Sequence, residues 1–202
     1  MKTTEAFSKY INFTSKGKKQ TAHLCSSNSI IGDNFTLSGK TILNKFNQDI
    51  GEVDADIARE ISILKNKNFT INIYLTFVAY SDGGAHWGEI LIIAHDPKIG
   101  AFKIFCDLIQ KRLEQGNRPK FEIDKFTVNK IIETNGKWQP KELMPKPKLE
   151  EGQAIIKSKM GFLDKLVEAA RDKNPGCYVG SIFFLMMVAG LIFCLIMGVF
   201  GF

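Results

Sequence analysis

The chain has 202 residues, of which 45% are hydrophobic and 24% are charged, and 16 of them are phenylalanines. This composition is typical of a globular protein and excludes an intrinsically disordered chain. The formal net charge of +6 comes from lysines and arginines scattered through the sequence, with no run of five basic residues. We therefore expect no nucleic-acid partner.

The four cysteines are far apart in the sequence and include no CxxC pair. They are Cys25, Cys106, Cys177 and Cys194. Their spacing, together with only three scattered histidines, predicts neither a metal site nor a bound cofactor. It fits a domain in a reducing compartment.

The first 20 residues are polar and rich in lysine, and we expect a loosely held N-terminal arm or a short first helix there. An α+β domain is predicted from residue 21 to residue 143. At its start, between His23 and Phe46, short apolar pairs alternate with Ser, Gly and Asn. This pattern favours short strands joined by turns at residues 32–34 and 38–40.

The clearest helix of the domain is predicted over residues 53–65. Its apolar residues recur at spacings of three and four, which places them on one stripe. These residues are Ile50, Val53, Ile57, Ile61 and Leu64. Acidic residues at the start and lysines at the end complement the helix dipole.

Residues 69–80 predict the best strand, because apolar and polar side chains alternate strictly along FTINIYLTFVAY. A turn at residues 81–85 leads to a second strand over residues 87–95. Its centre, residues 90–94, is apolar without interruption, so this strand is expected to be central and covered on both faces. The two strands are interpreted as an antiparallel hairpin.

A second helix is predicted after Ile99, since Phe102, Phe105, Cys106, Ile109 and Leu113 have helical spacing. A third strand over residues 102–108 is the alternative. Residues 121–133 alternate imperfectly, and Asn135-Gly136 is a hairpin-turn signal leading to Trp138.

Three further segments are predicted in the C-terminal part of the chain. Residues 144–152 contain two prolines and predict a linker without helix. Residues 153–175 predict an amphipathic stalk helix. Residues 178–202 predict a single transmembrane anchor, since no charged side chain follows Asn174 and about 20 apolar residues span a bilayer.

The anchor predicts a tail-anchored membrane protein. The lysines and arginines near the span all precede it, so the positive-inside rule keeps the N-terminal domain in the cytosol. The membrane itself is not identified, although a bacterial inner membrane is favoured. Gly190, Cys194 and Gly198 are spaced four apart and predict a ridge of small residues for self-association in the bilayer.

Four residues are candidates for chemistry: Asp82, His86, Glu89 and His95. The first three belong to the loop from Tyr80 to Glu89, whose side chains could transfer protons, and the fourth ends a predicted strand. A simple hairpin turn explains the same loop. Cys106 with a histidine is a further nucleophile–base candidate. The Gly39-Lys40-Thr41 triplet is not a P-loop, because Asn34 replaces the first glycine of that motif.

These observations predict an α+β fold: an antiparallel sheet with a few packed helices, then the stalk helix and the C-terminal transmembrane helix. The expected function is that of a cytosol-facing binding or scaffold module, which recruits a protein partner to the lipid bilayer or forms a subunit of a membrane complex. One alternative is a membrane-tethered enzyme, such as a hydrolase, built on the Tyr80–Glu89 loop. The other is a membrane-active effector component.

Overall fold

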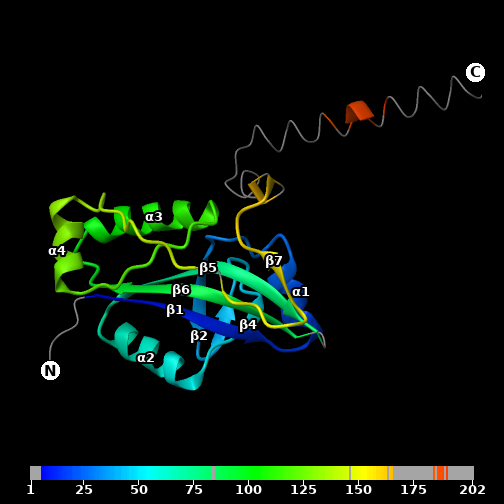
Figure 1. Cartoon of the computed structure of the whole chain (residues 1–202), viewed down its shortest axis with the longest axis horizontal. Coiled ribbons are helices and arrows are strands. Elements are labelled where there is room, and N and C mark those ends of the chain that lie inside the picture. The colour runs from blue at the N-terminus through cyan, green and yellow to red at the C-terminus, as the bar shows by residue number, and fades with distance from the viewer. Residues whose placement is uncertain are drawn as a thin grey trace, which may run out of the picture. The chain divides into compact units, whose positions relative to one another are not determined.

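The computed structural model describes residues 6–82, 85–145, 147–162, 164, 165, 184, 186–188 and 190. The chain divides into two compact units, Met1–Met160 and Gly161–Phe202. The strands and helices of the first unit are shown in Figure 1, and their bounds are β1 Ala6–Ser15, α1 Gly17–Cys25, β2 Asn34–Ser38, β3 Thr41–Leu43, β4 Asp49–Glu52, α2 Ala55–Asn66, β5 Thr70–Ser81, β6 His86–His95, α3 Ala101–Glu114, α4 Lys125–Glu133 and β7 Gln153–Lys157.

Six antiparallel strands close into a barrel. They lie in the order β2-β3-β4-β1-β6-β5, and β2 pairs with β5 to close the ring. β7 lies outside the ring and pairs with the C-terminal half of β5. The predicted α+β fold, with an antiparallel sheet and packed helices, is confirmed. Closure into a barrel was not predicted, because it depends on the pairing of β2 with β5, about 40 residues apart in the sequence.

The predicted hairpin is confirmed as β5 and β6. β6 lies between β5 and β1, which agrees with its continuous apolar centre. Along β5 the predicted alternation fails at Thr76, because Leu75 pairs with Ile90 whereas Phe77 pairs with Glu89, so Thr76 is the extra residue of a β-bulge. Beyond the bulge the two faces of the strand exchange.

The exchange of faces decides which side chains enter the barrel. Val78, and not Phe77, joins Ile73 and Leu75 in the interior cluster. Phe77 packs instead against Trp87, with ring centroids 5.4 Å apart. The remaining interior comes from the other barrel strands, from Leu24, Ile31 and Val53, and from Ile61 of α2. The helix predicted over residues 53–65 is confirmed as α2, but Ile50 of the predicted stripe lies in β4 and Val53 precedes the helix.

α3 and α4 cover the outer face of the barrel where β1, β5 and β6 lie side by side. In Figure 1 they lie on the opposite side of these strands from α2. Leu91 and Ile93 of β6 pack there against Phe102 and Phe105 of α3. The helix predicted after Ile99 is therefore confirmed, and the alternative of a third strand there is wrong.

The imperfect alternation of residues 121–133 conceals α4. The Asp124 carboxylate accepts a hydrogen bond of 2.8 Å from the backbone N–H of Thr127 and thereby caps the helix. At the other end, the Gly136 N–H donates to the carbonyl of Ile131 with Gly136 at φ 79°. Asn135-Gly136 therefore ends a helix, and the hairpin turn expected there is wrong.

The N-terminal arm predicted for residues 1–20 is also wrong, since residues 6–15 form β1 in the middle of the sheet and residue 17 begins α1. Phe7, Ile11 and Phe13 point toward the interior cluster and share one face of the strand, on which every second residue lies. The exposed Lys9 interrupts this spacing. With a lysine at one of its inward positions, the segment does not stand out as a strand.

The start of the predicted stalk helix is wrong as well, because residues 153–157 form β7. The adjacent pair Ile155-Ile156 fits a strand as well as a helix, and the edge of β5 supplies a pairing partner. Lys157 then reaches the end of α1, where its Nζ donates to the carbonyls of Ser26 and Ser29 at 2.6 and 2.9 Å.

Most of the predicted C-terminal elements lie outside the described residues. This holds for residues 166–175 of the stalk, for most of the anchor at 178–202, and for Cys194 and Gly198 of the ridge that includes Gly190. Among the residues that are described, no helix combines the length and the apolar character that crossing a membrane requires.

We predict that Gly88→Ala destabilises the barrel. A methyl group at Gly88 would lie 2.6 Å from carbons of the Phe13 ring and 3.0 Å from the Phe77 carbonyl. Such overpacking costs about 1–3 kcal/mol. Urea unfolding of the full-length chain measures this cost, with Gly100→Ala as the control, because no atom beyond the adjacent residues lies within 4 Å of a methyl group there. Equal unfolding midpoints for the two variants would contradict this packing.

Candidate functional site: a groove beside the edge of β1

One edge of β1 is mostly without a strand partner. β1 pairs with β6 along its whole length, from Ala6↔His95 to Ser15↔His86. On its other side it pairs with β4 only at Thr14↔Glu52. Within the described part of the chain, residues 6–13 therefore have an edge whose backbone groups are unpaired, which we call the open edge. Such an edge is a template for another strand.

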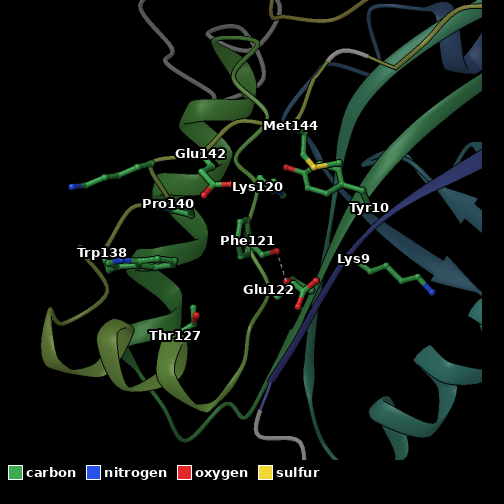
Figure 2. Close-up of a pocket in the computed structure, with 12 residues that line it drawn as sticks. Lys9, Tyr10, Lys120, Phe121, Glu122, Thr127, Trp138, Pro140, Glu142 and Met144 are labelled. Atoms are coloured by element: carbon green, nitrogen blue, oxygen red, sulfur yellow. Dashed lines mark hydrogen bonds and ion pairs between the residues drawn. The ribbon is translucent and has the colours of Figure 1, made fainter.

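A groove with a volume of about 670 Å³ lies beside this open edge (Figure 2). Three consecutive residues of β1 line it, so its wall includes the backbone of the strand as well as side chains. We call it the β1 groove, and it is lined by Ser8, Lys9, Tyr10, Lys120, Phe121, Glu122, Thr127, Trp138, Pro140, Lys141, Glu142 and Met144.

Aromatic side chains make the floor of the β1 groove rigid. The indole of Trp138 stacks on the Phe105 ring at a centroid distance of 5.9 Å and an interplanar angle of 21°. The Phe121 ring meets Phe105 edge to face at 5.5 Å. Phe105 is completely buried and belongs to α3. The Trp138 and Phe121 rings that line the groove are therefore held in place by Phe105, which belongs to the buried cluster between β6 and α3.

Two extended segments form the wall opposite β1, one containing residues 118–120 and the other residues 142–145. Their backbones are joined by bonds from Met144 N–H to the Arg118 carbonyl at 2.7 Å and from Lys120 N–H to the Glu142 carbonyl at 2.9 Å. Side chains of β1 fasten this wall to the barrel. The Tyr10 hydroxyl donates to the Pro119 carbonyl at 2.7 Å. Burial, together with the nearby Glu89 carboxylate, raises the pKa of Tyr10, so the phenol remains a donor.

A buried ion pair anchors the same wall. The carboxylate of Glu89, on β6, accepts from Arg118 Nε at 3.1 Å and from Nη2 at 2.5 Å. Their side chains are only 8% and 6% exposed. The Thr76 hydroxyl, from the bulge of β5, donates to the same carboxylate at 2.6 Å. The guanidinium also donates to the Pro145 carbonyl, so one arginine holds both segments of the wall.

Charges of both signs line the β1 groove. Lys120 and Glu142 form an exposed ion pair at 3.3 Å and neutralise each other. Lys9 and Lys141 are exposed, and neither forms an ion pair among the described residues. In Figure 2 the Lys9 side chain points away from Trp138 and Phe121. The open edge thus has a lysine on one side and the aromatic floor on the other.

The structure does not bring together the four residues that the sequence suggested for chemistry. His86 and His95 begin and end β6, about 30 Å apart at ~3.3 Å per residue. Glu89 is held by Arg118 and lies beneath the groove wall. Asp82 is exposed at the tip of the hairpin, where its backbone N–H donates to the Gly152 carbonyl.

His86 and its neighbour Trp87 line a second cavity of about 730 Å³, between the end of the β5–β6 hairpin and residues 148–153. His86 meets the Tyr80 ring at 5.1 Å. The indole Nε1 of Trp87 is buried, and no hydrogen-bond partner for it is found among the described residues. This cavity contains the predicted loop, but of the four candidates only His86 lines it.

His95 and Cys106 lie close together but do not form an activated nucleophile. Asn72 separates them, with its amide nitrogen 3.3 Å from His95 Nε2 and 3.6 Å from Cys106 Sγ. Burial raises the pKa of the Cys106 thiol to about 12, so it is protonated at neutral pH. Burial also lowers the pKa of His95, which stacks on Phe102 at 4.8 Å.

Among the described residues there is no group of three His, Cys, Asp or Glu side chains that could hold a metal ion. Sequence analysis did not identify the residues of the β1 groove, because they belong to segments whose structure was predicted wrongly. These segments are the N-terminal arm and the region after Phe121. The placement of Phe7, Ile11 and Phe13 on one strand face, although Lys9 interrupts it, is the signal that could have identified β1.

We predict that Glu89→Gln is strongly destabilising, by about 3–5 kcal/mol, because it leaves the buried Arg118 guanidinium without a counter-charge. Replacing both residues with methionine should recover much of this loss. Urea unfolding measures both effects. The control is Glu52→Gln, which removes an exposed ion pair with Lys16 and should cost at most about 1 kcal/mol. Equal losses for Glu89→Gln and Glu52→Gln would show that the buried pair does not fasten the wall.

We also predict that part of the acid sensitivity of the fold comes from His95. Because its pKa is lowered in the folded state, the unfolded chain binds the proton more tightly. The folded state is therefore favoured at pH values above the pKa of His95 in the unfolded chain, about 6.5, and it loses this stabilisation as the pH falls below that value. Unfolding free energies at pH 7.5 and 5.5 should differ less for His95→Gln than for the wild type. An unchanged difference would contradict this assignment.

Comparison of the chain with protein-family models, with curated proteins and with solved structures finds no match.

Proposed function

We propose that the protein is a binding or scaffold module that recruits a protein partner to a membrane. The observation that carries this proposal is the β1 groove, where an open strand edge lies beside an aromatic floor. Recognition of extended segments by strand addition uses these two features, backbone hydrogen bonds for affinity and side-chain pockets for specificity.

The state of the candidate chemical groups supports binding over catalysis at those positions. The Glu89 carboxylate is occupied by Arg118 and Thr76. The Cys106 thiol is buried and protonated at neutral pH. General acid–base or nucleophilic chemistry needs groups that converge on one substrate, and these do not. The enzyme alternative therefore has less support than the binding module.

Attachment to the membrane remains part of the proposal. It rests on the sequence after Asn174, which has no charged residue and 13 Leu, Ile, Val or Phe residues between Ser181 and Phe202. At about −0.3 to −0.6 kcal/mol each, these residues favour insertion by several kcal/mol. The folded unit that ends at Met160 would then be held at the membrane surface.

Photo-crosslinking in cells tests this function. A benzophenone amino acid in place of Lys141, on the rim of the β1 groove, should give one discrete cross-linked product in the membrane fraction. The matched control places the same amino acid at Glu60, which is exposed on α2 and does not line the groove.

Deleting residues 178–202 should move the protein and its cross-linked product together to the soluble fraction. The same product from both positions, or no product from Lys141, would contradict a partner site at the groove. Retention of the shortened chain on membranes would contradict the anchor.

A further inference from the structure

We infer that the open edge of β1 binds an extended, acidic segment of a partner protein, which adds to the barrel as a strand with its apolar side chains on the floor of the β1 groove. This inference rests on the proposed function and specifies its ligand.

The backbone of β1 restricts the conformation of the occupant. Among the described residues, 6–13 pair with β6 on one side and have no strand partner on the other. At ~3.3 Å per residue, these eight residues offer an edge of about 26 Å. Only an extended chain can pair its own N–H and C=O groups with such an edge, so a strand of about seven to nine residues fits it. A helix cannot make these bonds.

The side chains beside the edge predict an alternating pattern in that strand. Successive side chains of a strand point to opposite faces. On one face the added strand would meet Trp138, Phe121 and Pro140, which favours apolar residues. On the other face it would meet Lys9, whose side chain points away from this floor in Figure 2. Acidic residues at the alternate positions would complement Lys9.

The charge of the groove distinguishes a partner segment from a second copy of this chain. Three lysines and two glutamates line the groove, and the chain as a whole has a net charge of +6. Two β1 edges in antiparallel contact would bring the Lys9 residues of both copies close together, which is unfavourable. An acidic strand meets the opposite charge, and its approach is also favoured by the net charge.

The experiment uses the full-length chain in a non-ionic detergent and a fluorescein-labelled nonapeptide of alternating glutamate and valine. Fluorescence anisotropy measures binding, and hydrogen exchange reports the protection of the β1 amides. We expect saturable binding together with slower exchange in residues 6–13. The first control peptide has lysine in place of glutamate. The second has methyl groups on alternate backbone nitrogens. Both should bind at least about tenfold more weakly, since the first reverses the charge and the second removes the ladder.

Charge reversal at two exposed lysines tests the inference without disturbing the fold. Lys9→Glu should weaken binding of the acidic peptide by about fivefold or more at low salt, and this difference should shrink as salt is added. Lys103→Glu makes the same change of charge on α3, outside the groove lining, and should have little effect. Equal effects of the two variants would overturn the inference.

Other outcomes separate this inference from the proposed function. Equal binding of the N-methylated peptide would rule out strand addition, and equal binding of the lysine peptide would rule out the acidic preference. A concentration-dependent dimer that protects β1 without added peptide would identify a second copy as the occupant. If no peptide binds but Lys141 still gives a discrete cross-link in cells, the ligand assignment fails and the binding function stands. If neither is seen, both fail.

Discussion

The contact between Glu89 and Arg118 joins parts of the structure that would otherwise be independent. Glu89 belongs to the central strand β6, whereas Arg118 belongs to the irregular segment after α3. An uncompensated charge at either position would be costly, because both side chains are almost completely buried. The pair is therefore satisfied only when the segment after α3 lies against the barrel and Pro145 is close enough to accept from the same guanidinium. The bulge at Thr76 adds a third contact, since its hydroxyl donates to the carboxylate. The wall of the β1 groove thus depends on one ion pair and on one irregularity in β5.

The groove is also a consequence of how the barrel closes. β4 is only four residues long, so it reaches only the C-terminal end of β1, at Thr14. Over the rest of β1, no neighbouring strand in the described part of the chain pairs with this edge, and the barrel interior beside β1 is filled by the apolar side chains of the interior cluster. Hydrophobic closure without strand pairing leaves backbone groups unsatisfied along one edge. Natural sheets protect such edges with charges, and Lys9 is placed where it opposes association of two copies. In the proposed complex the same lysine would favour an acidic partner, so protection of the edge and recognition of a partner would be compatible at this position.

The sequence predicts the parts of this fold in which the hydrophobic pattern is strong and local. The hairpin of β5 and β6, α2 and α3 follow from period-two or helical spacing. The errors arise where a different interaction decides the structure. Lys9 breaks the apolar alternation of β1, and the Asp124 cap fixes α4 where alternation suggested otherwise. β7 forms because the edge of β5 is available for pairing. The β1 groove could not be predicted for the same reason, because its walls come from β1 and from residues more than 100 positions later.

The candidate residues for chemistry show the difference between sequence proximity and spatial convergence. Asp82, His86 and Glu89 are neighbours in sequence, but strand geometry points His86 and Glu89 to opposite faces, and Asp82 lies at the exposed tip. Glu89, the most buried of these three, has a structural role, because its carboxylate is paired with Arg118 and accepts a hydrogen bond from Thr76. In contrast, the groove combines residues that have no recognisable motif, such as Ser8, Trp138 and Met144. A site that recognises the backbone of its ligand needs an open edge and an apolar floor rather than reactive side chains, and for this reason it leaves little trace in a single sequence.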